Sequence, residues 1–191
     1  SFIPICAGRK AARMGIHMLF AFDGKTPQVG ADSYVSPTAQ VIGDVRIGSG
    51  CYIGHGAILR GDYGTILIGD HTAVEEGVIL HAAPGAVNEL GLDVTLGHGA
   101  IIHGRSIGNG CLIGMGAVVS LSAVIGENTI VAEGAVVRQG QQVPGGVLVG
   151  GIPAKVIREV TDKDLQSRRE SVELYVGLAK KYLNLGMEQL D

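Results

Sequence analysis

The chain has 191 residues, a formal net charge of −3, and 46% hydrophobic but only 4% aromatic residues. This balance provides no basic surface for nucleic acid or for an anionic membrane, and no apolar run approaches the roughly 20 residues of a membrane span. With 31 glycines and no Trp, the composition favours a narrow interior of small aliphatic side chains. We therefore expect a single slim β domain, with no nucleic-acid partner and no membrane association.

The N-terminal segment, residues 1–17, has basic residues but no convincing secretory signal, because Asp23 and Lys25 interrupt the apolar patch that follows it. We interpret this segment as a flexible extension. The three cysteines, Cys6, Cys51 and Cys111, are odd in number and lack metal-ligand spacing. They predict reduced thiols and a cytoplasmic protein.

From residue 18 to residue 158 the chain shows a six-residue repeat of aliphatic positions. A small residue often stands four positions after the aliphatic one, as Cys51 follows Ile47 and Ala57 follows Ile53. A fixed hexapeptide period is typical of a β-helix, a solenoid in which three hexapeptides form one triangular coil. The aliphatic positions include Val35, Val41, Ile47, Ile53, Leu59, Ile68, Val74, Leu80, Leu96, Ile102, Ile107, Ile113, Val119, Ile125, Val131, Val137, Val143 and Val149.

Residues 159–191 have a different, helical pattern. Thr161 is placed as an N-cap, and Asp162 and Asp164 fall in the first turn, where they complement the helix dipole. The apolar residues that follow predict a helix that packs back on the coils. These residues are Leu165, Val172, Leu174, Leu178, Tyr182 and Leu185.

The register of the repeat brings distant polar residues together. Leu59, Leu80 and Ile102 should occupy the same position of three successive coils, if short insertions follow Leu59 and Leu80. The residues directly after them, Arg60, His81 and His103, should then form one column at one corner, about 4.8 Å apart per coil.

His98 belongs to a different corner, because it lies two residues after Leu96 and directly above Glu76. Imidazole is a common metal ligand. Within one chain, His98 should therefore not reach an ion that His81 and His103 bind. In a cyclic trimer unlike corners of neighbouring subunits meet. The register thus predicts a homotrimer in which His81 and His103 of one chain and His98 of the next share a metal.

The local sequence around these positions resembles the gamma-class carbonic anhydrase-like family of hexapeptide-repeat proteins. The resemblance is carried by three stretches: Arg60-Gly61-Asp62, then Glu75 through His81, then Gly97 through Gly104. It implies a left-handed parallel β-helix of about six triangular coils with a C-terminal α-helix. It also implies a zinc site, with Fe²⁺ or Co²⁺ as alternative metals.

By the same resemblance, a zinc-bound hydroxide would hydrate CO2 reversibly to bicarbonate at a trimer interface. His81, His98 and His103 would be the metal ligands, and Arg60 and Asp62 would form an ion pair between subunits beside the site. Glu75 and Glu76 would act near the metal, although the family usually has Gln and Asp at these positions. A carboxylate at Glu75 would retain Zn²⁺ but disfavour bicarbonate.

The family's proton-relay acids are also replaced, by Tyr63 and by the loop that contains Pro84. Glu89 in that loop is an acid that could substitute. Two other functions remain open. One is a hexapeptide acyltransferase or acyl-CoA thioesterase with a histidine as general base. The other is a non-catalytic trimeric metal-binding or assembly protein.

Overall fold

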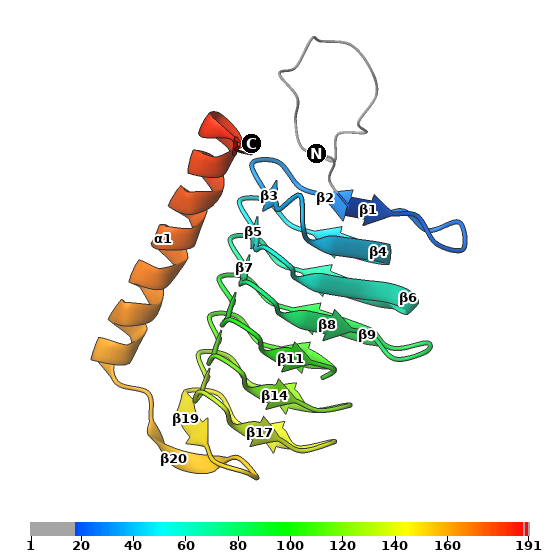
Figure 1. Ribbon diagram of the computed structural model, residues 1–191. Coiled ribbons are helices and arrows are strands. Elements are labelled where there is room, and N and C mark those ends of the chain that lie inside the picture. Colours follow the sequence, from blue (N-terminus) through cyan, green and yellow to red (C-terminus); the bar gives the residue numbers. More distant parts are fainter. Residues whose placement is uncertain (1–17, 189, 191) are drawn as a thin grey trace.

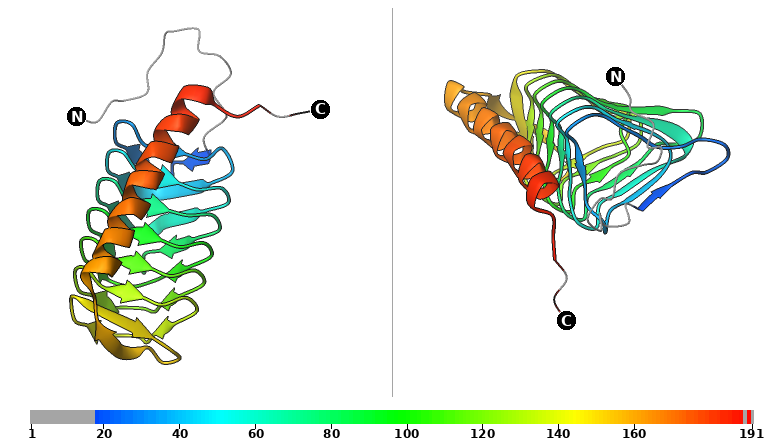
Figure 2. Two further views of the ribbon diagram at one scale, coloured as in Figure 1. Left: turned by 90° about the vertical axis from the view of Figure 1, so that its left-hand side faces the viewer. Right: turned by 90° about the horizontal axis from the view of Figure 1, so that it is seen from above.

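The computed structural model describes residues 18–188 and 190. These residues form a left-handed parallel β-helix with a triangular cross-section, and one C-terminal helix, α1 (Asp162–Leu185), lies along its outside (Figure 1, Figure 2). The fold predicted from the hexapeptide period and the family resemblance is confirmed. The predicted flexible extension, residues 1–17, lies outside the described residues.

Each coil adds one strand to each of three faces, and strands of successive coils pair in parallel. The first face contains β1 (Met18–Phe20), the beginnings of β4 (Gln40–Ile47) and β6 (Ile58–Ile68), β8 (Ile79–His81), β11 (Ile101–Ile102), β14 (Val118–Val119) and β17 (Val136–Val137). The second face contains β2 (Gln28–Val29), the ends of β4 and β6, β9 (Val87–Leu90), β12 (Ser106–Ile107), β15 (Val124–Ile125) and β18 (Gln142–Val143). The third face contains β3 (Tyr34–Val35), β5 (Tyr52–Ile53), β7 (Ala73–Val74), β10 (Thr95–Leu96), β13 (Leu112–Ile113), β16 (Ile130–Val131), β19 (Val147–Gly150) and the antiparallel β20 (Lys155–Glu159).

The solenoid has about seven turns, one more than expected, because a coil precedes the one that contains Val41. Leu19 pairs with Val41, and Val29 pairs with Ile47, so both occupy aliphatic positions of the repeat. The sequence pattern hides this coil because the chain makes a short excursion between Leu19 and Val29, closed by a bridge between Phe22 and Lys25.

The aliphatic residues of the repeat point inward and form one continuous core. Ile53, Leu59, Leu80 and Leu96 are among those that are fully buried. Burial of each such side chain contributes about 1.5–3 kcal/mol relative to exposure. The small residues four positions later, such as Cys51 and Ala57, are also fully buried.

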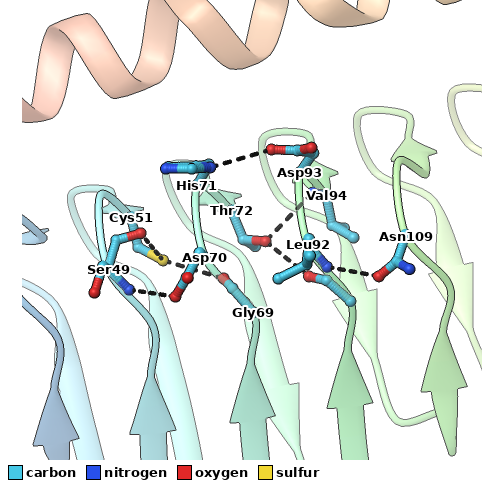
Figure 3. Close-up of polar contacts among 11 residues, drawn as sticks. Ser49, Cys51, Gly69, Asp70, His71, Thr72, Leu92, Asp93, Val94 and Asn109 are labelled. Atoms are coloured by element: carbon cyan, nitrogen blue, oxygen red, sulfur yellow. Dashed lines mark hydrogen bonds and ion pairs between the residues drawn. The ribbon is translucent and has the colours of Figure 1, made fainter. Parts of the chain in front are cut away.

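The corner between the second and third faces is held by polar contacts from coil to coil (Figure 3). The Ser49 amide donates to Asp70 Oδ1 at 2.7 Å, and His71 Nδ1 lies 3.4 Å from Asp93 Oδ1. The Cys51 thiol donates to the Gly69 carbonyl at 3.3 Å, and Cys111 donates similarly to the Gly126 carbonyl at 3.0 Å. Both thiols are buried and free, so they serve as corner donors rather than as cross-links.

Helix α1 packs against β3, β5 and β7 of the third face and runs back toward the first coils (Figure 1). Thr161 caps it as predicted, because its hydroxyl accepts a bond from the Asp164 amide and the Asp164 carboxylate accepts from the Thr161 amide. The predicted apolar stripe is only partly right, since Leu174 and Leu185 are exposed. The helix packs through Leu178 and Tyr182 of the predicted set, together with Tyr175 and Ala179.

None of the helices among residues 18–188 and 190 is long and apolar enough to cross a membrane.

Candidate metal centre

The predicted column of polar residues is present where the first face meets the second. Leu59 pairs with Leu80, and Leu80 pairs with Ile102, so the side chains that follow them are stacked in register. Arg60 and His81 are direct partners in the ladder between β6 and β8. We call this group, Arg60, Asp62, His81 and His103, the His81 corner.

The two histidines of this corner present ring nitrogens to each other. His103 Nε2 lies 2.7 Å from His81 Nδ1, and the rings stack with 4.7 Å between their centroids. His81 Nε2 is buried and has no hydrogen-bond partner among the described residues, since Asp62 Oδ1 is 3.5 Å away. A buried ring nitrogen without a partner is unfavourable unless another group fills its coordination.

The electrostatic surroundings keep His81 neutral. Burial lowers the pKa of its imidazole and the neighbouring Arg60 lowers it further, and these effects together outweigh the opposing effect of the Asp62 carboxylate. Neutral imidazole is the form that binds a metal ion. The donor chemistry and the unpartnered nitrogen therefore fit a divalent transition metal such as zinc, with His81 and His103 as two of its ligands.

Asp62 and Arg60 form an ion pair within one chain, with 2.7 Å between Arg60 Nη1 and Asp62 Oδ2. We expected this pair to join two subunits; within one chain the two side chains already meet, and a pairing between subunits stays a prediction. Burial opposes ionisation of Asp62, but hydrogen bonds from Arg60 and from the Tyr63 amide outweigh it and lower the pKa of the carboxyl. Asp62 is therefore a fixed negative charge beside His81.

His98 lies at another corner, where the third face meets the first. Leu96 pairs with Val74, which places His98 above Glu76 as predicted. His98 Nδ1 lies 2.8 Å from Glu76 Oε2, and His98 Nε2 lies 3.1 Å from Glu75 Oε2. We call Glu75, Glu76 and His98 the His98 corner. In the part of the chain that the structure describes, no three ligand side chains converge on one point to hold a metal.

Two tyrosines that the sequence did not single out support the carboxylates of the His98 corner. The Tyr52 hydroxyl donates to Glu76 Oε1 at 2.7 Å, and Tyr175 of α1 lies against Glu75. Burial raises the pKa of Tyr175, and hydrogen bonding to Glu75 raises it further. The available signal was the scarcity of aromatic residues, because four of the five tyrosines gather between α1 and the third face.

Of three further polar residues, Glu89 lies away from both corners, His55 stands one coil before Glu76 in the column of the His98 corner, and Tyr63 adjoins the His81 corner. Glu89 is on the outer surface of the second face, where it lines a shallow hollow of about 210 Å³ together with Arg46. His55 contacts Ser36 and Tyr182, with 2.6 Å between its Nδ1 and Ser36 Oγ. Tyr63 is exposed next to Asp62. Glu89 is therefore poorly placed to serve the His81 corner.

Several known proteins are similar to this chain over most of its length. A family described as bacterial transferase hexapeptide (six repeats) matches residues 26–61. Gamma carbonic anhydrase 2, a mitochondrial protein of Arabidopsis thaliana, is 36% identical over 169 residues, 85% of this chain and 60% of that protein. Carnitine operon protein CaiE of Salmonella newport is 41% identical over 160 residues, 84% of this chain and 81% of that protein. The chain belongs to the family of hexapeptide-repeat proteins that includes CaiE, and it is similar to a gamma-class carbonic anhydrase.

The chain is also similar to solved structures whose proteins are assigned to transferase groups. A solved structure from Bacillus cereus, provisionally assigned as an acetyltransferase, superposes with a TM-score of 0.85 at 33% identity, covering 88% of this chain and 98% of that one. The chain spans 60% of the length of the plant carbonic anhydrase that it matches. Family membership thus accounts for the fold, while the reaction depends on the site.

Proposed function

We propose that the protein is a zinc-dependent, gamma-carbonic anhydrase-like enzyme that hydrates CO2 to bicarbonate at a site shared between subunits of a homotrimer. One observation carries the proposal. His81 and His103 face each other with an unpartnered buried nitrogen at one edge of the first face, and His98 stands at the opposite edge. The two histidines at one edge of a subunit and His98 at the opposite edge of the next subunit would together supply three ligands to one metal ion.

The outer surface of the first face supports the trimer. Between the two corners it presents a stripe of β-branched residues, Ile58, Ile79, Ile101, Val118 and Val136, which are paired neighbours along the solenoid. Ile79 and Ile101 are 39% and 43% exposed in the single chain. An apolar stripe with a half-site at each edge is suited to a heterologous interface that places the edge of one subunit against the opposite edge of the next.

The residues of the two corners have separate tasks in this mechanism. His81 and His103 supply two neutral nitrogens, and Glu76 orients the ring of His98 through Nδ1, which leaves Nε2 for the ion. Zinc, when bound, lowers the pKa of a water ligand to about 7 and so supplies the nucleophile for CO2. Arg60 and Asp62 hold His81 from one side, and the Arg60 charge attracts the bicarbonate product. Fe²⁺ and Co²⁺ are alternative occupants because imidazole also suits them.

A mixing experiment tests the shared site. His81→Ala and His98→Ala chains, each alone, should bind almost no zinc, because each removes one ligand from every site. Coexpressed in equal amounts, they should form trimers in which about a quarter of the interfaces combine an intact His81 with an intact His98. Zinc content of about 0.25 per chain in mixed trimers is the expected result. No gain on mixing, in trimers that native mass spectrometry shows to contain both chains, would overturn the shared site.

An acyl-CoA transferase or thioesterase is the second candidate, and the likeness to the Bacillus cereus structure favours it. Stopped-flow CO2 hydration by zinc-, iron- and cobalt-loaded trimers separates the candidates. Hydration that requires metal and is lost in His103→Ala supports the carbonic anhydrase. Acyl transfer from acetyl-CoA that is insensitive to metal removal would replace it with the second candidate. Metal retained without either activity would leave a non-catalytic binding or assembly protein.

A further inference from the structure

The His98 ring has one carboxylate more than it needs. Its two nitrogens face Glu76 and Glu75, at 2.8 and 3.1 Å. A neutral imidazole has a single N–H, so it can donate to only one of these carboxylates. When the ring offers its other nitrogen to a metal, the second carboxylate is left beside that metal.

Glu76 is the carboxylate that orients the ring. Residues of the solenoid fix its position, because the Tyr52 hydroxyl of β5 donates to its Oε1 while its Oε2 faces His98 Nδ1. A carboxylate fixed in this way holds a ligand imidazole in one orientation and directs Nε2 away from the coil. Glu75 is therefore the carboxylate that would lie next to the ion.

Glu75 is held by the C-terminal helix as well as by the solenoid. It is buried, and its Oε2 accepts a bond from the His98 amide at 3.1 Å. The Tyr175 ring packs on Tyr52 with 5.3 Å between centroids. After burial, the Glu75 carboxylate is the neighbouring group that most raises the pKa of the Tyr175 hydroxyl. The raised pKa of the phenol keeps it protonated near neutral pH, so Tyr175 remains a donor.

We propose that Tyr175 is a positioning residue that keeps the Glu75 carboxylate from becoming a fourth protein ligand of the metal at His98. This inference rests on the proposed metal site. Three histidines leave one coordination position open for the reacting water, whereas a fourth protein ligand gives the closed arrangement of structural zinc sites. The family usually has an amide at position 75, and an amide ligates zinc poorly. This chain has the carboxylate of Glu75 there, so it needs a hydroxyl that restrains that carboxylate.

The Tyr175→Phe variant tests the proposal through zinc affinity, measured by competition with a chromophoric chelator. Loss of the hydroxyl should free Glu75 to bind the metal. Zinc should then bind roughly tenfold or more tightly while CO2 hydration falls, and the absorption of Co²⁺-loaded trimers should change with the ligand set. A residue with a merely structural role would instead lose affinity, by about 10–100-fold for a supporting group of a ligand.

Two further variants make the result specific. Tyr182→Phe is the matched control, because Tyr182 packs on Tyr34 from the same side of α1 and its hydroxyl contacts His55 rather than Glu75. It should weaken helix docking similarly without tightening zinc. Adding Glu75→Gln to Tyr175→Phe should return zinc affinity to near the wild-type value, because the amide removes the competing ligand.

The outcomes separate this inference from the proposed function. Wild-type trimers that bind zinc, together with unchanged or weaker binding in Tyr175→Phe, would overturn the role of Tyr175 alone. Wild-type trimers that bind zinc but do not hydrate CO2 would overturn the reaction, while the affinity comparison would still decide the role of Tyr175. Wild-type trimers that bind no metal would overturn both.

Discussion

The imidazole rings of His81 and His103 stack at 4.7 Å because β8 and β11 pair in register, with Leu80 opposite Ile102. The two histidines are 22 positions apart, four more than an eighteen-residue coil, and the extra residues are accommodated outside the coil between His81 and Leu90. Register in a β ladder is strict, because a slip of one residue would turn every side chain to the other side of the face. The proposed metal pair is thus fixed by the packing of the core and not by the histidines.

Arg60→Ala should weaken the trimer more than it weakens the folded chain. In one chain the Arg60 side chain is 42% exposed, and such a pair contributes only about 0–1 kcal/mol to unfolding. If the interface covers the His81 corner, loss of Arg60 strands the Asp62 carboxylate and costs roughly 3–5 kcal/mol of assembly. Sedimentation equilibrium over a range of concentrations measures this effect, together with zinc content.

Arg46→Ala is the matched control, because Arg46 pairs with Asp44 at 3.5 Å and its side chain is 53% exposed. Arg46 lies on the second face, outside both corners. Equal, small effects of the two substitutions, within about 0.5 kcal/mol and with zinc retained, would place Arg60 on free surface and contradict the proposed interface.

The sequence was sufficient to predict the fold and the relative register of the site. Six-residue spacing, with short insertions allowed after Leu59 and Leu80, placed Arg60 below His81 and His98 above Glu76, because a solenoid converts sequence position into height and corner. Prediction was weakest where the period is interrupted. The coil that contains Leu19 was missed, because a short excursion separates it from the next repeat position.

Contacts between the helix and the solenoid could not be predicted from the sequence. The helical period identified α1, but its contact side is set by tertiary packing of Tyr175 and Tyr182 on the third face, and not by its most apolar residues. For the same reason the proximity of Tyr175 to Glu75 could not be predicted from the sequence. The pairing of Arg60 with Asp62 in one chain likewise depends on side-chain conformation, which spacing does not determine.

The two corner thiols should be unreactive in the folded protein. Burial raises the pKa of Cys51 and of Cys111 to about 11, so roughly a thousandth of either thiol is ionised at pH 8. In a Cys6→Ser variant, which leaves only these two thiols, Ellman's reagent at pH 8 should therefore find no rapidly reacting group. Both should react after unfolding in guanidinium. Rapid reaction of one thiol in the native state would show that its corner opens.

The cap of α1 should depend on pH in acid. Hydrogen bonds from Arg158, and then from Thr161, hold the pKa of Asp164 below its ordinary value near 3.8. A depressed carboxyl pKa stabilises the fold above the unfolded-state value, and this contribution is lost as the pH falls through the folded-state value. Asp164→Asn should therefore lower the thermal midpoint of the helical signal at about pH 6, and the difference from wild type should shrink below about pH 3.

Asp162→Asn is the control for this prediction, because Asp162 also lies in the first turn but takes no part in the capping box. It should lower the midpoint less, through the helix dipole alone. If the two variants lose the same amount at every pH, the hydrogen bonds of Asp164 are not what secures the start of the helix.

Glu75→Gln should raise CO2 hydration near pH 7 and strengthen inhibition by small anions. The Glu75 carboxylate lies 3.1 Å from His98 Nε2, so its charge would sit beside the metal, repel bicarbonate and favour water over hydroxide. The amide removes that charge and keeps the shape. The opposite expectation follows if Glu75 is a general base, since its loss would then reduce the rate by roughly 10²-fold or more.

Glu76→Gln separates the two carboxylates, because weakening the orienting contact to Nδ1 should cost about 10–100-fold in zinc affinity. A large loss of hydration in Glu75→Gln with zinc fully retained would make Glu75 a catalytic residue and contradict the electrostatic explanation.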